Sequence, residues 1–79
     1  MTFQEYLEKR RITAGPTGDF TRDARKDPGM SEIESWPQLQ AYLFRQANGR
    51  RVKDIVDAAE PVWKGYRALV LKNRRENQR

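Results

Sequence analysis

The sequence of 79 residues contains no cysteine and no histidine. Without cysteine the chain has neither disulfide bonds nor thiolate metal ligands, a composition that suits a reducing compartment. Without histidine it lacks the commonest general base at neutral pH and the commonest transition-metal ligand. A single domain of this size also leaves little room for a deep substrate cavity. We therefore expect a protein that is not an enzyme and that uses no cofactor and no metal ion.

Long hydrophobic runs are missing as well. No stretch approaches the ~20 apolar residues that a membrane-spanning helix needs, and the polar start Met-Thr-Phe-Gln-Glu does not look like a signal peptide. We expect a cytoplasmic protein with no membrane partner. Eight aromatic residues lie among regularly spaced aliphatic residues, and this pattern predicts a folded core instead of a disordered chain.

Local signals in the first part of the chain predict two short helices. Thr2 begins a capping-box pattern, which starts a helix, and the glycines and proline of residues 14–18 end it. A second helix, capped by Thr17 or Asp19, is expected to run to about Asp27. The following Pro-Gly pair breaks that helix and opens a loop.

Ser35 is predicted to cap a third helix, which the Asn-Gly pair at 48–49 ends. A fourth helix begins at residue 51 or 52. Pro61 favours a break near Glu60 and a fifth helix beyond it, because proline lacks the N–H group that a helix interior uses.

The final helix carries an apolar face that turns polar toward its end, formed by Val62, Trp63, Tyr66, Leu69 and Val70. This helix is expected to project from the core and to fray after about Leu71. The chain is thus predicted to be all-α: a compact bundle of four to five short helices with a longer basic C-terminal helix. Residues 1–71 form a single helical domain, and 72–79 are a basic helical extension or a frayed tail.

Four short motifs follow one another along the chain: Phe3-Gln4-Glu5-Tyr6-Leu7, Asp19-Phe20 with Ala24 and Asp27, Trp36-Pro37-Gln38-Leu39 with Tyr42-Leu43, and Trp63-Lys64-Gly65-Tyr66. In order and spacing they resemble the YozE-like family of small bacterial helical proteins. The resemblance implies a fold related to sterile alpha motif domains. The chain departs from the family pattern at residues 28–30 and in its longer, more basic tail. Nucleic-acid binding has been inferred for such folds by analogy, so the resemblance supports the fold more than the function.

The net charge of +5 is confined to the last part of the chain. Residues 1–63 hold ten basic and ten acidic residues, whereas residues 64–79 hold six basic residues and only Glu76 as an acid. At 100° per residue the six cations fall within roughly 160° of a helix surface. These candidate binding residues are Lys64, Arg67, Lys72, Arg74, Arg75 and Arg79. Their alternative interpretation is an ordinary solvated surface.

A second basic group, Arg50, Arg51 and Lys53, lies at the start of the fourth helix, where it opposes the helix dipole. It is a further candidate for binding, although nearby aspartates could neutralise it locally. Phe44 lies off the main apolar stripe and is expected to be partly exposed. The aspartates at 19, 23 and 27 recur every four residues and are predicted to form surface ion pairs, not a metal site.

Taken together, these features predict a small non-enzymatic module that contacts nucleic-acid phosphates through its last helix, in DNA or RNA and with little sequence preference. The alternative is a protein-interaction adaptor like a sterile alpha motif domain. It would pair the basic face with an acidic protein, or with the chain's own acidic surface, Asp19, Asp23, Asp27, Glu32 and Glu34, in self-association.

Overall fold

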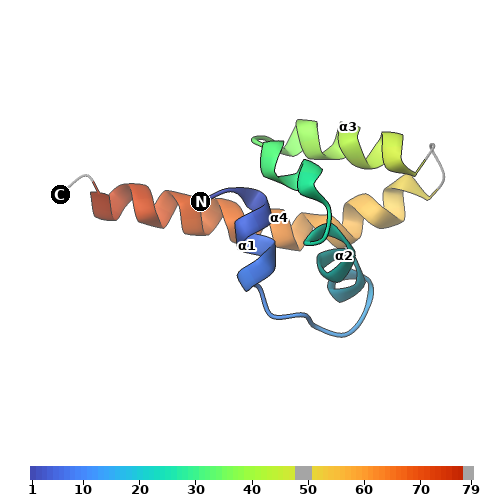
Figure 1. The fold of residues 1–79 in the computed structure, drawn as a ribbon, viewed down its shortest axis with the longest axis horizontal. Coiled ribbons are helices and arrows are strands. Elements are labelled where there is room, and N and C mark those ends of the chain that lie inside the picture. Colours follow the sequence, from blue (N-terminus) through green and yellow to red (C-terminus); the bar gives the residue numbers. More distant parts are fainter. Residues whose placement is uncertain (48–50, 78–79) are drawn as a thin grey trace.

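The computed structural model describes the backbone of residues 1–47 and 51–77 and the side chains of residues 1–47 and 51–73. Within these residues all regular structure is helical, which confirms the predicted all-α bundle (Figure 1). The elements are α1 (Phe3–Lys9), α2 (Pro16–Ala24), the 3-10 helix η1 (Pro28–Glu32), α3 (Trp36–Gln46) and α4 (Val52–Asn77).

Helix α1 begins as predicted. The Thr2 hydroxyl accepts a hydrogen bond from the Glu5 N–H at 3.1 Å, and the Glu5 carboxylate accepts one from the Thr2 N–H at 3.3 Å. Each side chain satisfies a backbone donor that has no partner inside the helix. Phe3 and Leu7 are completely buried, so the cap fixes which face of α1 meets the core.

Helix α2 begins earlier than predicted. Its N-cap is Gly15, not Thr17 or Asp19, and Pro16 occupies the first turn. Gly15 has a φ of +92°, a backbone conformation that residues other than glycine rarely adopt. The fixed φ of Pro16 suits the first helical position. The helix ends at Ala24, three residues before the predicted end. Inside it, Gly18 lies against the backbone of Thr13, leaving no room for a Cβ atom.

The segment between α2 and α3 is a short 3-10 helix, not a plain loop. An Asp27 carboxylate oxygen accepts a hydrogen bond from the Gly29 N–H at 2.9 Å, and the side chains of Met30 and Ile33 are buried. Ser35 then caps α3 through the Gln38 N–H at 3.2 Å, as predicted. Helix α3 ends at Gln46, and the predicted stop at 48–49 lies outside the described residues.

The predicted break near Glu60 is wrong. Helix α4 is continuous from Val52 to Asn77, with Pro61 in its interior. An interior proline costs about 3 kcal/mol in a helix. Here its ring is exposed, while Ala59, Val62 and Trp63 on the opposite side are buried in the core. The buried apolar stripe continues on both sides of position 61 in the sequence, while Pro61 itself faces away from it. Packing of this stripe against the core keeps the two halves of α4 on one axis. The helix also continues beyond Leu71, where fraying was expected.

The core is richest in aromatic rings where α1 crosses α4. The Phe3 ring makes edge contacts with Trp63 and Tyr66, at centroid distances of 5.0 and 5.3 Å. Tyr6 lies 5.6 Å from Tyr66. Gly65 faces the Tyr6 hydroxyl, and its missing side chain permits this close crossing. The Tyr66 hydroxyl also donates to the Met1 carbonyl at 3.0 Å, which ties the chain start to α4.

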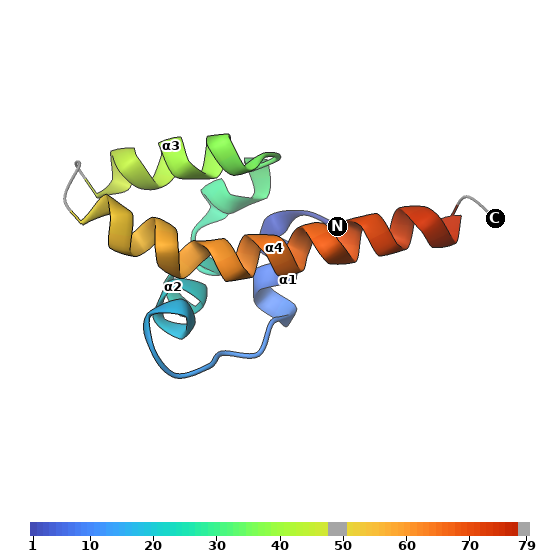
Figure 2. The same ribbon diagram turned by 180° about the vertical axis from the view of Figure 1, so that it is seen from behind.

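Helix α4 lies along the longest dimension of the molecule, which measures 46 × 25 × 20 Å. Figures 1 and 2 show α1, α2 and α3 gathered along its first half, whereas its last turns extend beyond them. We call residues 52–66 the proximal part of α4 and residues 67–77 its distal part. Burial supports this division, since Tyr66 is the last buried residue for which the side chain is described.

Candidate functional site

Three of the predicted binding cations lie on the surface of α4 with their side chains described. Lys64, Arg67 and Lys72 are all exposed, whereas Val62 and Tyr66 of the same helix are buried. Arg67 and Lys72 belong to the distal part, where α4 extends past the other helices. The exposed Ala68 and Leu71 fall between these cations on the helix surface.

Lys64 differs from the other two because it has an acidic partner. Its ammonium group lies 3.0 Å from a Glu60 carboxylate oxygen, one helical turn earlier. Both side chains are well exposed, so the pair adds little to stability. It does reduce the charge that Lys64 presents to a ligand. Arg67 and Lys72 are therefore the stronger binding candidates among the described cations.

The remaining cations of this group can be placed only in part. Arg74 and Arg75 lie on the helical backbone of α4, but their side chains are outside the described residues, as is all of Arg79. The sequence still assigns their charges to the end of the chain.

The second basic group is not brought together with the first. Arg50 lies outside the described residues, and Arg51 and Lys53 are exposed at the opposite end of α4. From Lys53 to Arg67 the helix rises by about 20 Å. The exposed Asp57 and the partly exposed Glu60 lie between them along the helix. The chain thus presents two separate cationic regions instead of one continuous stripe.

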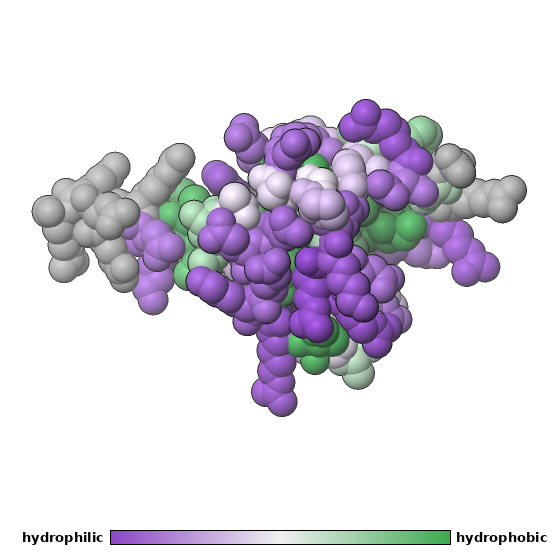
Figure 3. All heavy atoms as spheres, viewed as in Figure 1, coloured by the Kyte–Doolittle hydropathy of each residue, from purple (hydrophilic) through white to green (hydrophobic). Residues whose placement is uncertain are grey.

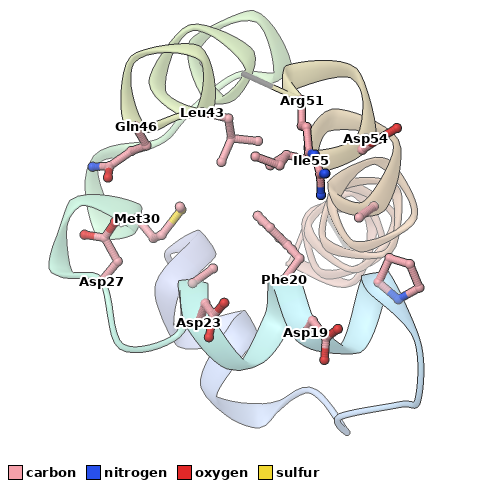
Figure 4. Close-up of a pocket in the computed structure, with 13 residues that line it drawn as sticks. Asp19, Phe20, Asp23, Asp27, Met30, Leu43, Gln46, Arg51, Asp54 and Ile55 are labelled. Carbon is pink, nitrogen blue, oxygen red and sulfur yellow. The ribbon is translucent and has the colours of Figure 1, made fainter. Parts of the chain in front are cut away.

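A pocket of about 560 Å³ opens between α2, η1, α3 and the start of α4 (Figure 4). Its apolar floor is formed by Phe20, Ala24, Met30, Leu43, Ile55 and Ala58. Figure 4 shows Phe20, Leu43 and Ile55 pointing toward its centre from three different helices. Phe20 and Ile55 are only half-buried, so the floor remains partly exposed to solvent.

Among the described residues, the rim of this pocket is mainly acidic, with Asp19, Asp23, Asp27 and Asp54 and one cation, Arg51. We call it the acid-rimmed pocket. The predicted ion pairing is confirmed only for Asp19, which lies 2.8 Å from the Arg22 guanidinium. Arg51 has a φ of +50° next to the first residue of α4. Its side chain lies beside Ile55 in Figure 4.

Asp27 has a structural role instead of the predicted ion pairing. Besides capping η1, it accepts a hydrogen bond of 2.5 Å from the Tyr42 hydroxyl, which in turn accepts one of 3.1 Å from the Gln46 amide. The bond to Asp27, together with burial and the carboxylate charge, raises the pKa of Tyr42 above its usual 10.0. Asp27 is therefore committed to this contact, and Asp23 and Asp54 are the more available acids of the rim.

Sequence reasoning did not find the acid-rimmed pocket. The four-residue spacing of Asp19, Asp23 and Asp27 indicated a shared side of α2, and that signal was interpreted as surface pairing. Asp54 and Ile55 join the pocket from α4, and no local pattern connects them with α2. Phe44 was identified correctly, since 57% of its surface is exposed.

Metal binding and membrane insertion receive no support from the described part of the chain. Among those residues, no group of three or more acidic side chains is arranged to hold a metal ion. Nor is any described helix both long and apolar enough to cross a membrane.

The chain matches no protein-family model, no curated protein and no solved structure. The resemblance to the YozE-like family therefore stays a hypothesis, supported by the four motifs alone. The distal part of α4 and the acid-rimmed pocket are the two candidate interaction surfaces of the protein.

Proposed function

We propose that this protein is a small non-enzymatic module that binds nucleic-acid phosphates through the distal part of α4. The observation that carries the proposal is that α4 continues past the packed core, with Arg67 and Lys72 exposed on a segment that other elements leave uncovered. The sequence adds Arg74 and Arg75 to the same segment, against one acid, Glu76.

The chemistry of these side chains suits a phosphate backbone. An arginine guanidinium bonds two phosphate oxygens at once, and lysine acts as a flexible point charge. Binding of several cations releases counterions condensed on the nucleic acid, which makes affinity strongly dependent on salt. A projecting helix can lie along a groove or across the backbone without a clash with the rest of the domain. Contacts of this kind carry little sequence information.

A direct test is a salt titration of binding to a short DNA duplex, followed by fluorescence anisotropy. We expect binding at low salt that weakens as salt rises. In the double variant Arg67→Gln/Lys72→Gln the slope of log K against log salt should become shallower by about 1.8, because two phosphate contacts are lost. Affinity should fall by a similar factor for unrelated duplex sequences.

The matched control is Arg11→Gln/Lys26→Gln, which removes two exposed cations from other parts of the chain. This control should retain most of the affinity and the slope. Absence of binding at low salt, or an affinity that does not change with salt concentration, contradicts the proposal.

The adaptor role is the second candidate function, and one observation favours it. Asp19, Asp23 and Asp27, which form most of the predicted acidic surface, line one pocket with a partly exposed apolar floor. A charged rim around an apolar centre is a common design of protein-binding surfaces. The other two predicted acids, Glu32 and Glu34, lie away from this pocket.

A further inference from the structure

The acid-rimmed pocket defines the chemistry of the ligand that it can bind. The half-buried side chains of Phe20 and Ile55 leave apolar surface open to solvent. Among the described residues of the rim, four aspartates outnumber one arginine. A matching ligand therefore presents an apolar side chain flanked by cations. The volume of about 560 Å³ is in the range of binding pockets and accommodates several side chains, not a whole helix.

The distal part of α4 carries this combination of groups. Leu71, a large aliphatic side chain, is 48% exposed. Arg67 and Lys72 lie beside it on the surface of the same helix. In Figure 3 hydrophobic atoms are visible on this segment beside the grey atoms, and other hydrophobic patches appear at the lower edge and toward the opposite end of the molecule.

We propose that the acid-rimmed pocket of one copy binds the distal part of α4 from a second copy. Leu71 enters the apolar floor, while Arg67 and Lys72 approach Asp23 and Asp54 on the rim. This inference deepens the adaptor role proposed above by naming the partner, and it does not depend on nucleic-acid binding.

The contact has to form between two molecules. Ile55 in the pocket and Leu71 lie on one continuous helix, about 24 Å apart along its axis. A copy therefore cannot fold its own distal part into its own pocket. The two surfaces differ, so the association is head to tail, and in a pair one copy keeps a free pocket while the other keeps a free helix end. Such contacts form open chains unless the rotation closes a ring.

A competition follows from the shared cations. Arg67 and Lys72 cannot bond to the aspartates of a second copy and to phosphates at once. Nucleic acid should therefore dissociate the assembled copies, and assembly should weaken nucleic-acid binding.

The first test measures the mass of the full chain by sedimentation velocity over a range of concentrations at low and high salt. We expect assembly at low salt that salt reverses. Leu71→Gln and Asp23→Asn/Asp54→Asn should each weaken assembly about tenfold, because each removes a central contact. The control Glu8→Gln/Glu34→Gln makes the same change in net charge at exposed positions outside the pocket and should assemble like the original chain.

Mixing the variants tests the head-to-tail geometry directly. The Leu71→Gln copy keeps an intact pocket, and the Asp23→Asn/Asp54→Asn copy keeps an intact distal helix. At a concentration at which each variant alone is monomeric, the mixture should form a one-to-one complex and nothing larger. Thermal unfolding followed by circular dichroism checks that each variant is folded. If the pocket variant is not, the exposed Leu71→Gln carries the test.

Three results would overturn the inference: a monomeric original chain at low salt and high concentration, a mixture of variants that stays monomeric, or a control that assembles as weakly as the pocket variant. Duplex binding separates this inference from the phosphate-binding role. If the chain binds duplex but never assembles, only the self-association proposal is contradicted. If it assembles without binding duplex, only the nucleic-acid proposal is contradicted.

Discussion

The proximal and distal parts of α4 belong to one helix but have opposite character. In the proximal part, Ala59, Val62 and Trp63 are buried, and three acidic residues and two basic residues are present. In the distal part, the described side chains are half-buried or exposed, and four cations face a single acid. The contrast indicates that the first half of the helix holds the domain together, while the second half is available to a partner.

The largest effect is expected from truncation in the proximal part. Trp63→Ala removes a buried ring that packs against Phe3 and Tyr66, and should lower the free energy of unfolding by about 3–5 kcal/mol. On the same helix, Leu71→Ala should change it by less than about 0.5 kcal/mol, because that side chain is half exposed. Urea unfolding followed by circular dichroism measures both. Similar losses of unfolding free energy for the two variants would show that the proximal and distal parts of α4 contribute equally to stability.

A smaller effect of opposite sign is expected where the two parts join. Pro61→Ala restores the N–H group that can bond to the Asp57 carbonyl, and alanine is about 3 kcal/mol more favourable than proline inside a helix. Part of this gain is offset because proline also stiffens the unfolded chain. We expect a net stabilisation of about 1–2 kcal/mol, measured by urea unfolding. Destabilisation would instead show that α4 needs a proline-dependent bend to pack.

Outside α4, the domain is also held together by a polar contact between Tyr42 of α3 and Asp27. Tyr42→Phe should cost about 1.5 kcal/mol, since the lost hydrogen bond joins a hydroxyl to a carboxylate. The raised pKa of Tyr42 gives this contact a pH dependence. Its stabilisation is complete below about pH 10, the pKa of unfolded tyrosine, and is lost as the pH rises through the higher folded value.

Unfolding free energies of the original chain and Tyr42→Phe, compared from neutral to alkaline pH, check this sign. The difference between them should shrink as the pH rises. A difference that grows with pH would contradict the assignment. The conservative change Gln46→Glu offers a second comparison, because a new carboxylate beside the tyrosine hydroxyl should raise the pKa of Tyr42 further.

Local patterns predicted the helix starts well and the tertiary features poorly. The caps at Thr2 and Ser35 depend on residues three positions away, so their signals are complete in the sequence. At Pro61 the local signal favoured a break, but the buried stripe on either side outweighed it. The location of net charge was visible in the sequence. The acid-rimmed pocket was not, because it forms only when Asp54 and Ile55 meet α2 across a folded core.

The smallest change in affinity and stability is expected near the end of the proximal part, where Glu60 pairs with Lys64. Glu60→Gln frees Lys64 for phosphate and should raise duplex affinity about twofold, because an exposed pair of this kind is weak and screened by salt. Stability should change by less than about 0.5 kcal/mol. Glu34→Gln makes the same charge change at an exposed position outside α4, and anisotropy titrations at low salt compare the two. Equal gains would mean that the duplex responds only to net charge. A gain confined to Glu60→Gln would place the edge of the phosphate-binding surface at Lys64, within the proximal part.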